Sequence, residues 1–249
     1  MSSSGSTPEV RIPASEATAK LKEMKSSMME DAEKLIFKTI PRRILNLDEV
    51  LKSPDFKILD QDQYGLLVDA PEPTGRNEVD GAGDYQLDPT EKVDTLPMLP
   101  GAEIRLNQTL ERLHKVVEPL AEQLVNDCYL LKMWIQLLIP KVEDGNNFGV
   151  GIQESCLDQV SGVQKDSASY IDEVTRYYLT RAKAVSKVTR YPRVEDFRRT
   201  VLEVDQKQYL HVTMFVRQLR NDYILLHDVL TKNIGKIQKP RNYNAENLY

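Results

Sequence analysis

Apolar residues recur at steps of three and four along four stretches of the chain, and polar residues fill the positions between them. The last stretch is the most regular, and its steps lie close to the seven-residue repeat of packed helices. Its apolar positions are Val212, Val216, Leu219, Tyr223, Leu226, Leu230, Ile234 and Ile237. No stretch shows a convincing alternation of apolar and polar residues, the pattern typical of a strand. The chain is therefore predicted to be all-α.

Residues that break or cap helices set the expected limits of these stretches. The first helix is expected to begin after Pro13, with Ser15 as its cap, to bend at Pro41 and to end near Lys52. Pro119 lies inside the second stretch and predicts a kink, because proline removes one backbone hydrogen bond. The later helices are expected at about 102–139, 148–189 and 194–239.

Four long helical runs joined by turns and one longer linker predict a four-helix up-down bundle. A helix of about 40 residues is about 60 Å long at about 1.5 Å per residue. Rods of that length bury their sides more fully when copies of the chain pack together. An oligomer is therefore expected.

Two segments are expected to lie outside the packed helices. Residues 1–14 are polar and Ser-rich, which predicts a disordered leader before a single helical domain over residues 15–249. A flexible acidic linker is expected at about residues 53–101. From Asp60 to Thr95 it contains ten acidic residues, opposed only by Arg76 and Lys92. An exposed loop is the simpler interpretation, and a gate or docking segment at the mouth of an assembly is the alternative.

Composition excludes several classes of function. The formal net charge is -5, with 33 basic and 38 acidic residues, so no nucleic-acid partner is expected, because phosphates require a basic surface. No apolar run approaches the roughly 20 residues that span a bilayer, and no signal peptide is visible, which predicts a soluble intracellular protein without a membrane partner. Two cysteines without a CxxC pair are typical of a reducing compartment.

No set of residues predicts catalysis, a metal or a cofactor. The three histidines, His114, His211 and His227, are far apart and are expected to be packing or surface residues. Cys128 and Cys156 are expected to be buried or partly buried, without a base to activate them. The pair Glu143 and Asp144 lacks the further carboxylates or histidine that a metal site or an acid–base pair needs. The glycines fit no phosphate-binding spacing. The chain is therefore predicted not to be an enzyme.

The segment between the second and third helices is predicted to be a tight charged turn. Pro140 cannot continue a helix. Gly145 and Asn146 tolerate a positive φ, and Asn147 is placed to cap the following helix. Taken alone, this pattern indicates only a connection between two helices. A polar C-terminal tail over residues 240–249 ends in an aromatic residue beside a free carboxylate, which a docking peptide could use.

The turn and several strings in the second half of the chain resemble the 11S proteasome activators, the REG family. The turn Lys141 to Val150, with the preceding segment Lys132 to Leu137, resembles the activation loop of that family. The strings most similar to the gamma type are Tyr177 to Lys183, Tyr191 to Thr200 and Asn244 to Tyr249. The resemblance covers about residues 101–249, and before residue 101 only the helix pattern agrees.

The resemblance implies an ATP-independent activator of the 20S proteasome that forms a homoheptameric ring and admits peptides or unstructured proteins. It implies that the C-terminal tail docks between proteasome α subunits through Glu246, Asn247, Leu248 and Tyr249. It also implies that one loop, with Asn146 as its central residue, opens the proteasome gate. That loop comprises Lys141, Val142, Glu143, Asp144, Gly145, Asn146, Asn147, Phe148 and Gly149. The gamma type favours the nucleus, although the linker lacks a basic import cluster, so the cytoplasm stays open.

Two other hypotheses compete with the activator. A structural or adaptor bundle would bind partner helices through an exposed seam. It would tolerate changes at Asn146 and Tyr249 but lose partner binding on changes at Leu219 or Leu226. An enzyme would depend on Glu143 or His211 without any proteasome present.

Overall fold

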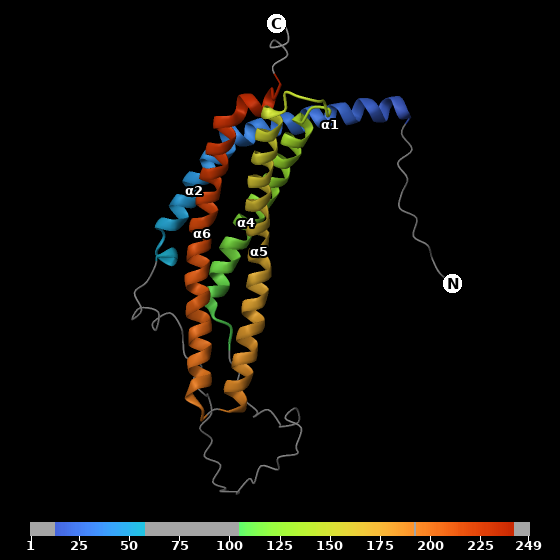
Figure 1. Ribbon diagram of the computed structural model, residues 1–249. Coiled ribbons are helices and arrows are strands. Elements are labelled where there is room, and N and C mark those ends of the chain that lie inside the picture. The colour runs from blue at the N-terminus through green and yellow to red at the C-terminus, as the bar shows by residue number, and fades with distance from the viewer. Residues whose placement is uncertain (1–12, 58–104, 192, 242–249) are drawn as a thin grey trace, which may run out of the picture. The chain divides into compact units, whose positions relative to one another are not determined.

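The computed structural model describes residues 13–57, 105–191 and 193–241 (Figure 1). Every regular element in these ranges is helical, which confirms the all-α prediction. The first run consists of the α-helices α1 and α2 with the π-turn η1 between them, and the short 3₁₀-turn η2 follows. The elements are α1 (Ala14–Lys34), η1 (Leu35–Thr39), α2 (Ile40–Lys52), η2 (Pro54–Phe56), α4 (Gln108–Leu138), α5 (Phe148–Arg190) and α6 (Glu195–Gln238).

The helices contribute to two compact units. The first unit comprises Met1–Leu45, Val125–Gln164 and Asp222–Tyr249, and the second comprises Asn46–Leu124 and Lys165–Asn221. The chain reverses between α4 and α5 in the first unit, and between α5 and α6 in the second unit. Each unit therefore contains a turn between successive long helices, as the up-down prediction requires.

The first helical run continues through Pro41 because a π-turn precedes the proline. In η1 the backbone N–H of Ile40 bonds to the carbonyl of Leu35, five residues back. Such single turns of wider helix accommodate residues that disturb the regular hydrogen-bond pattern. The run then continues to Lys52, the predicted end.

The first run begins directly after Pro13, as predicted, but its predicted cap and the predicted start of the second run are wrong. Helix α1 begins at Ala14 with Pro13 in the cap position and no side-chain cap, so Ser15 lies inside the helix. Helix α4 begins at Gln108, several residues later than expected. The reason is Asn107, whose side-chain oxygen accepts a hydrogen bond from the backbone N–H of Leu110 at 3.1 Å. An asparagine that caps in this way satisfies a free N–H and fixes the helix start.

The core of the first unit combines large apolar side chains with one ionic cluster. Trp134 is fully buried, and the part of the regular α6 stripe that belongs to this unit is buried at Tyr223, Leu226, Leu230 and Ile237. Arg43 forms an ion pair with Asp127, and the Tyr223 hydroxyl donates a hydrogen bond to Asp127 at 2.7 Å. Arg43 also donates to the Tyr223 hydroxyl at 3.1 Å. Because each member has partners, the buried charge of Asp127 is compensated.

In contrast, the N-terminal half of α1 extends away from its neighbours in the first unit (Figure 1). Residues 13–27 of this segment are exposed, including the apolar Leu21 and Met24. The apolar stripe predicted for the first helix is therefore buried only in its later part, from Ala32 onward.

The core of the second unit is organised around the fully buried carboxylate of Asp205. The Tyr177 hydroxyl donates to it at 2.9 Å, Arg181 Nε at 2.9 Å and Asn107 Nδ2 at 3.0 Å. The same asparagine caps α4, so this cluster joins α5 and α6 to the start of α4. Charge-assisted bonds of this kind are stronger than neutral ones.

The start of the predicted linker is packed rather than free. The Phe56 side chain is buried in the second unit. The Tyr209 hydroxyl donates to the carbonyl of Asp55 at 2.8 Å, and Arg112 pairs with the Asp55 carboxylate at 3.0 Å. Residues 58–104, which include the rest of the predicted acidic linker, lie outside the described residues.

His114 is buried in the second unit, a packing role that the sequence analysis predicted. The Gln208 amide donates to His114 Nε2 at 3.1 Å, so the proton lies on Nδ1, which faces the Tyr178 hydroxyl at 3.2 Å. Burial lowers the pKa of His114 from 6.5 to about 4, with a smaller contribution from the charge of His211. A second proton would place two donors, Nε2–H and the amide, against each other.

Acidification is expected to destabilise the fold through His114. Because the folded pKa is about 4 and the unfolded pKa 6.5, the unfolded chain binds the proton first. The stability is complete above pH 6.5, and about 3 kcal/mol is lost as the pH falls from 6.5 to 4. Denaturant unfolding at pH 7.5 and pH 4.5 measures this loss in the native protein and in the His114→Gln variant. An identical pH dependence in both proteins contradicts the assignment.

Candidate functional site

The C-terminal ends of α4 and α6 are joined by Gln153, a fully buried residue of α5. Its Nε2 donates to the carbonyl of Leu138 at 3.0 Å and to the carbonyl of Ile237 at 2.7 Å. These carbonyls belong to the last turns of α4 and α6, where backbone acceptors lack partners within the helix. Gln153 therefore fixes the end of α6 beside the end of α4.

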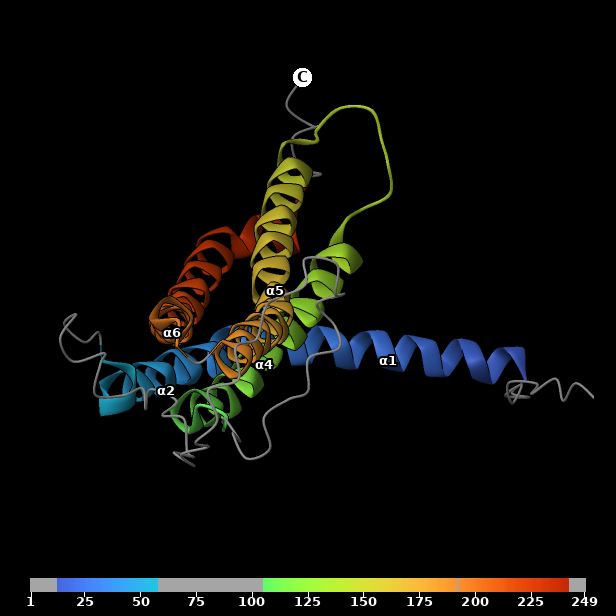
Figure 2. The same cartoon turned by 90° about the horizontal axis from the view of Figure 1, so that it is seen from below.

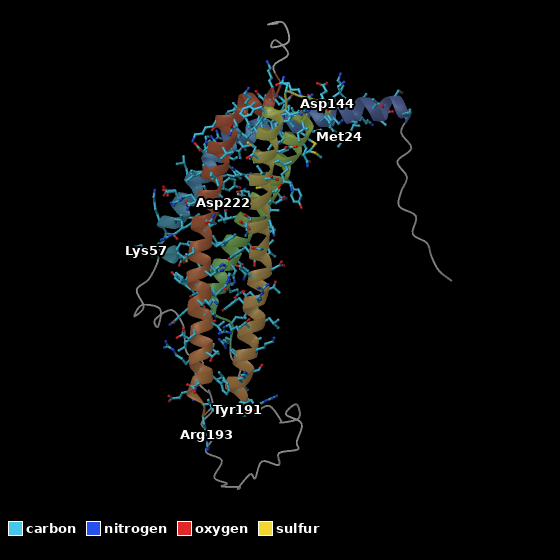
Figure 3. The ribbon with its side chains drawn as sticks, viewed as in Figure 1. Met24, Lys57, Asp144, Tyr191, Arg193 and Asp222 are labelled. Atoms are coloured by element: carbon cyan, nitrogen blue, oxygen red, sulfur yellow. The ribbon has the colours of Figure 1, made fainter. Side chains whose placement is uncertain are left out.

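The turn between these helices is exposed and has a defined backbone. Gly145 has a φ of 82° and Asn146 a φ of 48°, which confirms that both adopt the positive values predicted. Val142 and Phe148 point into solvent, with exposed fractions of 97% and 78%. The turn arches away from the ends of α4 and α5 (Figure 2), and Asp144 lies on it (Figure 3). The turn therefore exposes two large apolar side chains on a backbone with two positive φ values.

Arg241, the last described residue of the chain, holds this turn. Its Nη1 donates to the carbonyl of Lys141 at 2.9 Å, and its Nη2 donates to Asn147 Oδ1 at 3.0 Å. The same Nη1 pairs with the Glu143 carboxylate at 2.9 Å. Only 7% of Arg241 is exposed. Arg241 therefore connects the C-terminal segment to residues on both sides of the turn.

A close backbone contact brings these two segments together. A Cβ placed on Gly149 would overlap the carbonyl oxygen of Pro240. Glycine is thus the residue that allows the C-terminal segment to cross the first turn of α5. Arg241 follows this crossing directly and reaches the turn from it.

The predicted cap role of Asn147 is only partly correct. Its carbonyl accepts the first backbone bond of α5, from the N–H of Gly151 at 2.9 Å. Its side-chain oxygen accepts from Arg241 instead of from a backbone N–H, and its Nδ2 donates to the carbonyl of Glu143 at 3.2 Å. The side chain therefore stabilises the turn rather than the helix start.

The turn is predictable from the sequence, whereas the roles of Arg241 and Gln153 are not. Arg241 lies in a polar tail, and Gln153 is one of several glutamines on its helix. The available sequence signal is a basic residue directly after Pro240 in a chain that also has an acidic turn. The tail residues Glu246, Asn247, Leu248 and Tyr249 lie outside the described residues.

The described residues hold no group of three or more His, Cys, Asp or Glu side chains that could bind a metal. Glu143 is already paired with Arg241 and lies 3.6 Å from Lys141 Nζ. Cys128 and Cys156 are buried, as predicted, and burial raises the pKa of Cys128 to about 12, so its thiol stays protonated. Among the helices described, none combines the length and apolar character needed to cross a membrane.

The fold and site define an all-α bundle of long helices that presents a braced loop beside its C-terminal segment. Family models of the C-terminal and N-terminal parts of the proteasome activator PA28 match residues 103–247 and 15–71. The chain therefore belongs to the PA28 family of proteasome activators.

Individual relatives agree with the gamma type. "Proteasome activator complex subunit 3" of Homo sapiens is 40% identical over 245 residues, covering 94% of this chain and 96% of that protein. The Gallus gallus protein of the same name is 38% identical and covers 97% of both chains. Similarity to subunit 2 of Bos taurus is lower, at 30% identity over 94% of this chain and 95% of that protein. The predicted resemblance is confirmed.

Two solved structures share the fold. The 11S subunit of the Plasmodium falciparum proteasome, PA28, aligns with a TM-score of 0.72 and 26% identity over 95% of this chain and 99% of that chain. An alignment with a chain from the archaeal 20S proteasome in complex with mutated P26 activator gives a TM-score of 0.60. Its identity is 12%, over 93% of this chain and 99% of that chain, so this likeness concerns the fold alone.

Replacing Gly149 is expected to separate the two segments. The Gly149→Ala methyl group would overlap the Pro240 carbonyl, and such overpacking costs about 1–3 kcal/mol of unfolding free energy. Gly151→Ala is the matched control, since its methyl group meets nothing within 4 Å and alanine favours a helix by up to about 1 kcal/mol. Denaturant unfolding of both variants compares them. Equal stability of the two variants would disprove the close contact.

Proposed function

We propose that this protein is an ATP-independent activator of the 20S proteasome that opens the gate of the α-subunit ring to peptides and unstructured proteins. Its role is regulatory, with no catalytic residue of its own. The working unit is a homoheptameric ring. A nuclear location is part of the proposal on the strength of the gamma-type family alone.

The observation that carries the proposal is the braced loop at one end of the first unit. A loop that opens a gate must contact the open state better than the closed state, because a ligand shifts an equilibrium only by its differential affinity. The exposed Val142 and Phe148 provide apolar contact area, and the positive φ values at Gly145 and Asn146 give the loop a fixed form. We assign gate contact to residues 141–149.

Self-association is supported by apolar side chains exposed on the helices of both units. In the first unit Tyr129 and Met133 lie one turn apart on α4, with exposed fractions of 62% and 41%. In the second unit Leu210 and Met214 are spaced in the same way on α6 and are also exposed. Repeated apolar pairs on helix faces mark surfaces that gain from contact with another copy.

Docking is assigned to the tail that follows Arg241, with the carboxylate of Tyr249 as its terminal group. A single carboxylate–ammonium contact is directional but weak. Seven tails on one ring bind together, so the overall affinity exceeds that of one tail by about 100-fold or more. Docking and gate opening are therefore assigned to separate segments.

Removal of the tail is expected to abolish activation. Latent 20S proteasome is mixed with the intact protein or with a form lacking Asn247, Leu248 and Tyr249, and hydrolysis of fluorogenic peptides is followed without ATP. Light scattering first establishes that both forms assemble equally. Stimulation by the intact form alone supports the proposal. No stimulation by an assembled intact ring contradicts it and favours the adaptor bundle.

The backbone form of the loop is expected to decide gate opening. Asn146→Val places a β-branched residue at a φ of 48°, a strain that should lower maximal stimulation about fivefold or more. Asn146→Gly accommodates the same φ and should retain most of the stimulation. Maximal peptide hydrolysis at saturating activator is the measurement. Equal loss in both variants would show that the amide side chain, not the backbone, carries the effect.

A further inference from the structure

We propose that Arg241 is the positioning residue that holds the gate-opening loop in its working form from the base of the docking tail. The inference deepens the proposed function and rests on it for its consequence at the proteasome. The contacts of Arg241 with Lys141, Glu143 and Asn147, called the clamp below, are present in the isolated protein and can be tested there.

Arg241 contacts both ends of the loop at once. One guanidinium nitrogen bonds to the Lys141 carbonyl and pairs with Glu143, and the other bonds to Asn147 Oδ1. Between these anchors, residues 144–146 make no side-chain hydrogen bond or ion pair with any other described residue. The form of the central residues therefore depends on the anchors on either side of them.

The fork of donors on arginine suits this task. A guanidinium presents several N–H groups in a fixed plane, whereas a lysine ammonium acts as a point charge. Here the planar group is almost fully buried while Lys141, Glu143 and Asn147 are exposed. Without Arg241, water can satisfy these exposed acceptors, so the bundle should survive while the loop loses its brace.

The position of Arg241 in the chain links the two proposed contacts with the proteasome. It is eight residues before Tyr249 and follows Pro240, whose backbone crosses Gly149. Its clamp biases the loop toward one of its conformations without touching the gate. Loss of the clamp should thus reduce gate opening while leaving tail docking intact.

Trypsin tests the clamp in the full-length protein without any proteasome. The carbonyl of the Lys141–Val142 peptide bond, a trypsin site, accepts the bond from Arg241. Arg241→Ala should speed cleavage after Lys141 about fivefold or more, an effect within the usual range of coupling between sites. Lys239→Ala is the matched control, because Lys239 is exposed, carries the same charge and makes no side-chain bond with a described residue. Unchanged cleavage in Arg241→Ala, measured by mass spectrometry, overturns the proposal.

Activation assays then separate positioning from docking. For Arg241→Ala, the activator concentration that gives half-maximal stimulation should stay within about twofold of the native value, while maximal stimulation falls about fivefold or more. Arg241→Lys should be intermediate and Lys239→Ala should match the native protein. A higher half-maximal concentration with unchanged maximal stimulation would make Arg241 a docking residue and overturn the proposal. Unchanged values of both quantities would overturn it as well.

The two assays fail in different ways. If the native ring does not stimulate the proteasome, the proposed function fails, and the cleavage rate after Lys141 still decides whether Arg241 holds the loop. If the native ring stimulates and Arg241→Ala behaves like it in both assays, only the clamp is wrong. Light scattering and thermal unfolding of each variant identify any loss that comes from failed assembly or folding.

Discussion

The approach of the Pro240 backbone to Gly149 is the contact on which the arrangement of the α4–α5 turn and the C-terminal segment depends. It requires a residue without a Cβ at the first turn of α5, since any Cβ there would overlap the Pro240 carbonyl. It brings the C-terminal segment to the α4–α5 turn, where the Arg241 guanidinium meets Lys141, Glu143 and Asn147. Pro240, Arg241 and the α4–α5 turn are thereby joined to one another.

Behind this contact, polar side chains compensate the ends of the long helices. Gln153 binds the terminal carbonyls of α4 and α6 in the first unit. In the second unit Asn107 caps α4 and also binds Asp205, which in turn holds Arg181. Long helices leave unpaired backbone groups only at their ends, and these side chains bond to some of those groups. The bonds of Gln153 also give the exposed loop a fixed base at the end of α4.

The sequence predicted the elements well because their signals are local. Helix periodicity located the α6 stripe, and the combination of Pro140, Gly145 and Asn146 located the turn with its positive φ values. It failed at the start of α4, where the local cap by Asn107 lies outside the apolar pattern. It also failed where the deciding contact is distant, since Asn147 bonds to Arg241, almost a hundred residues away. Neither periodicity nor spacing carries information about such partners, so the clamp needed the structure.

The loop is proposed to keep its own form and to meet the proteasome gate while the tail docks beside it. A cryo-electron microscopy structure of the assembled ring on the 20S proteasome tests this most directly. Residues 141–147 are expected to retain the Arg241 contacts and the positive φ values at Gly145 and Asn146. The loop is expected to touch the turns that lead into the gate segments, with Tyr249 bound between α subunits. A loop that refolds on binding, or that lies away from the α-subunit ring, would show that the proposed gate contact is wrong.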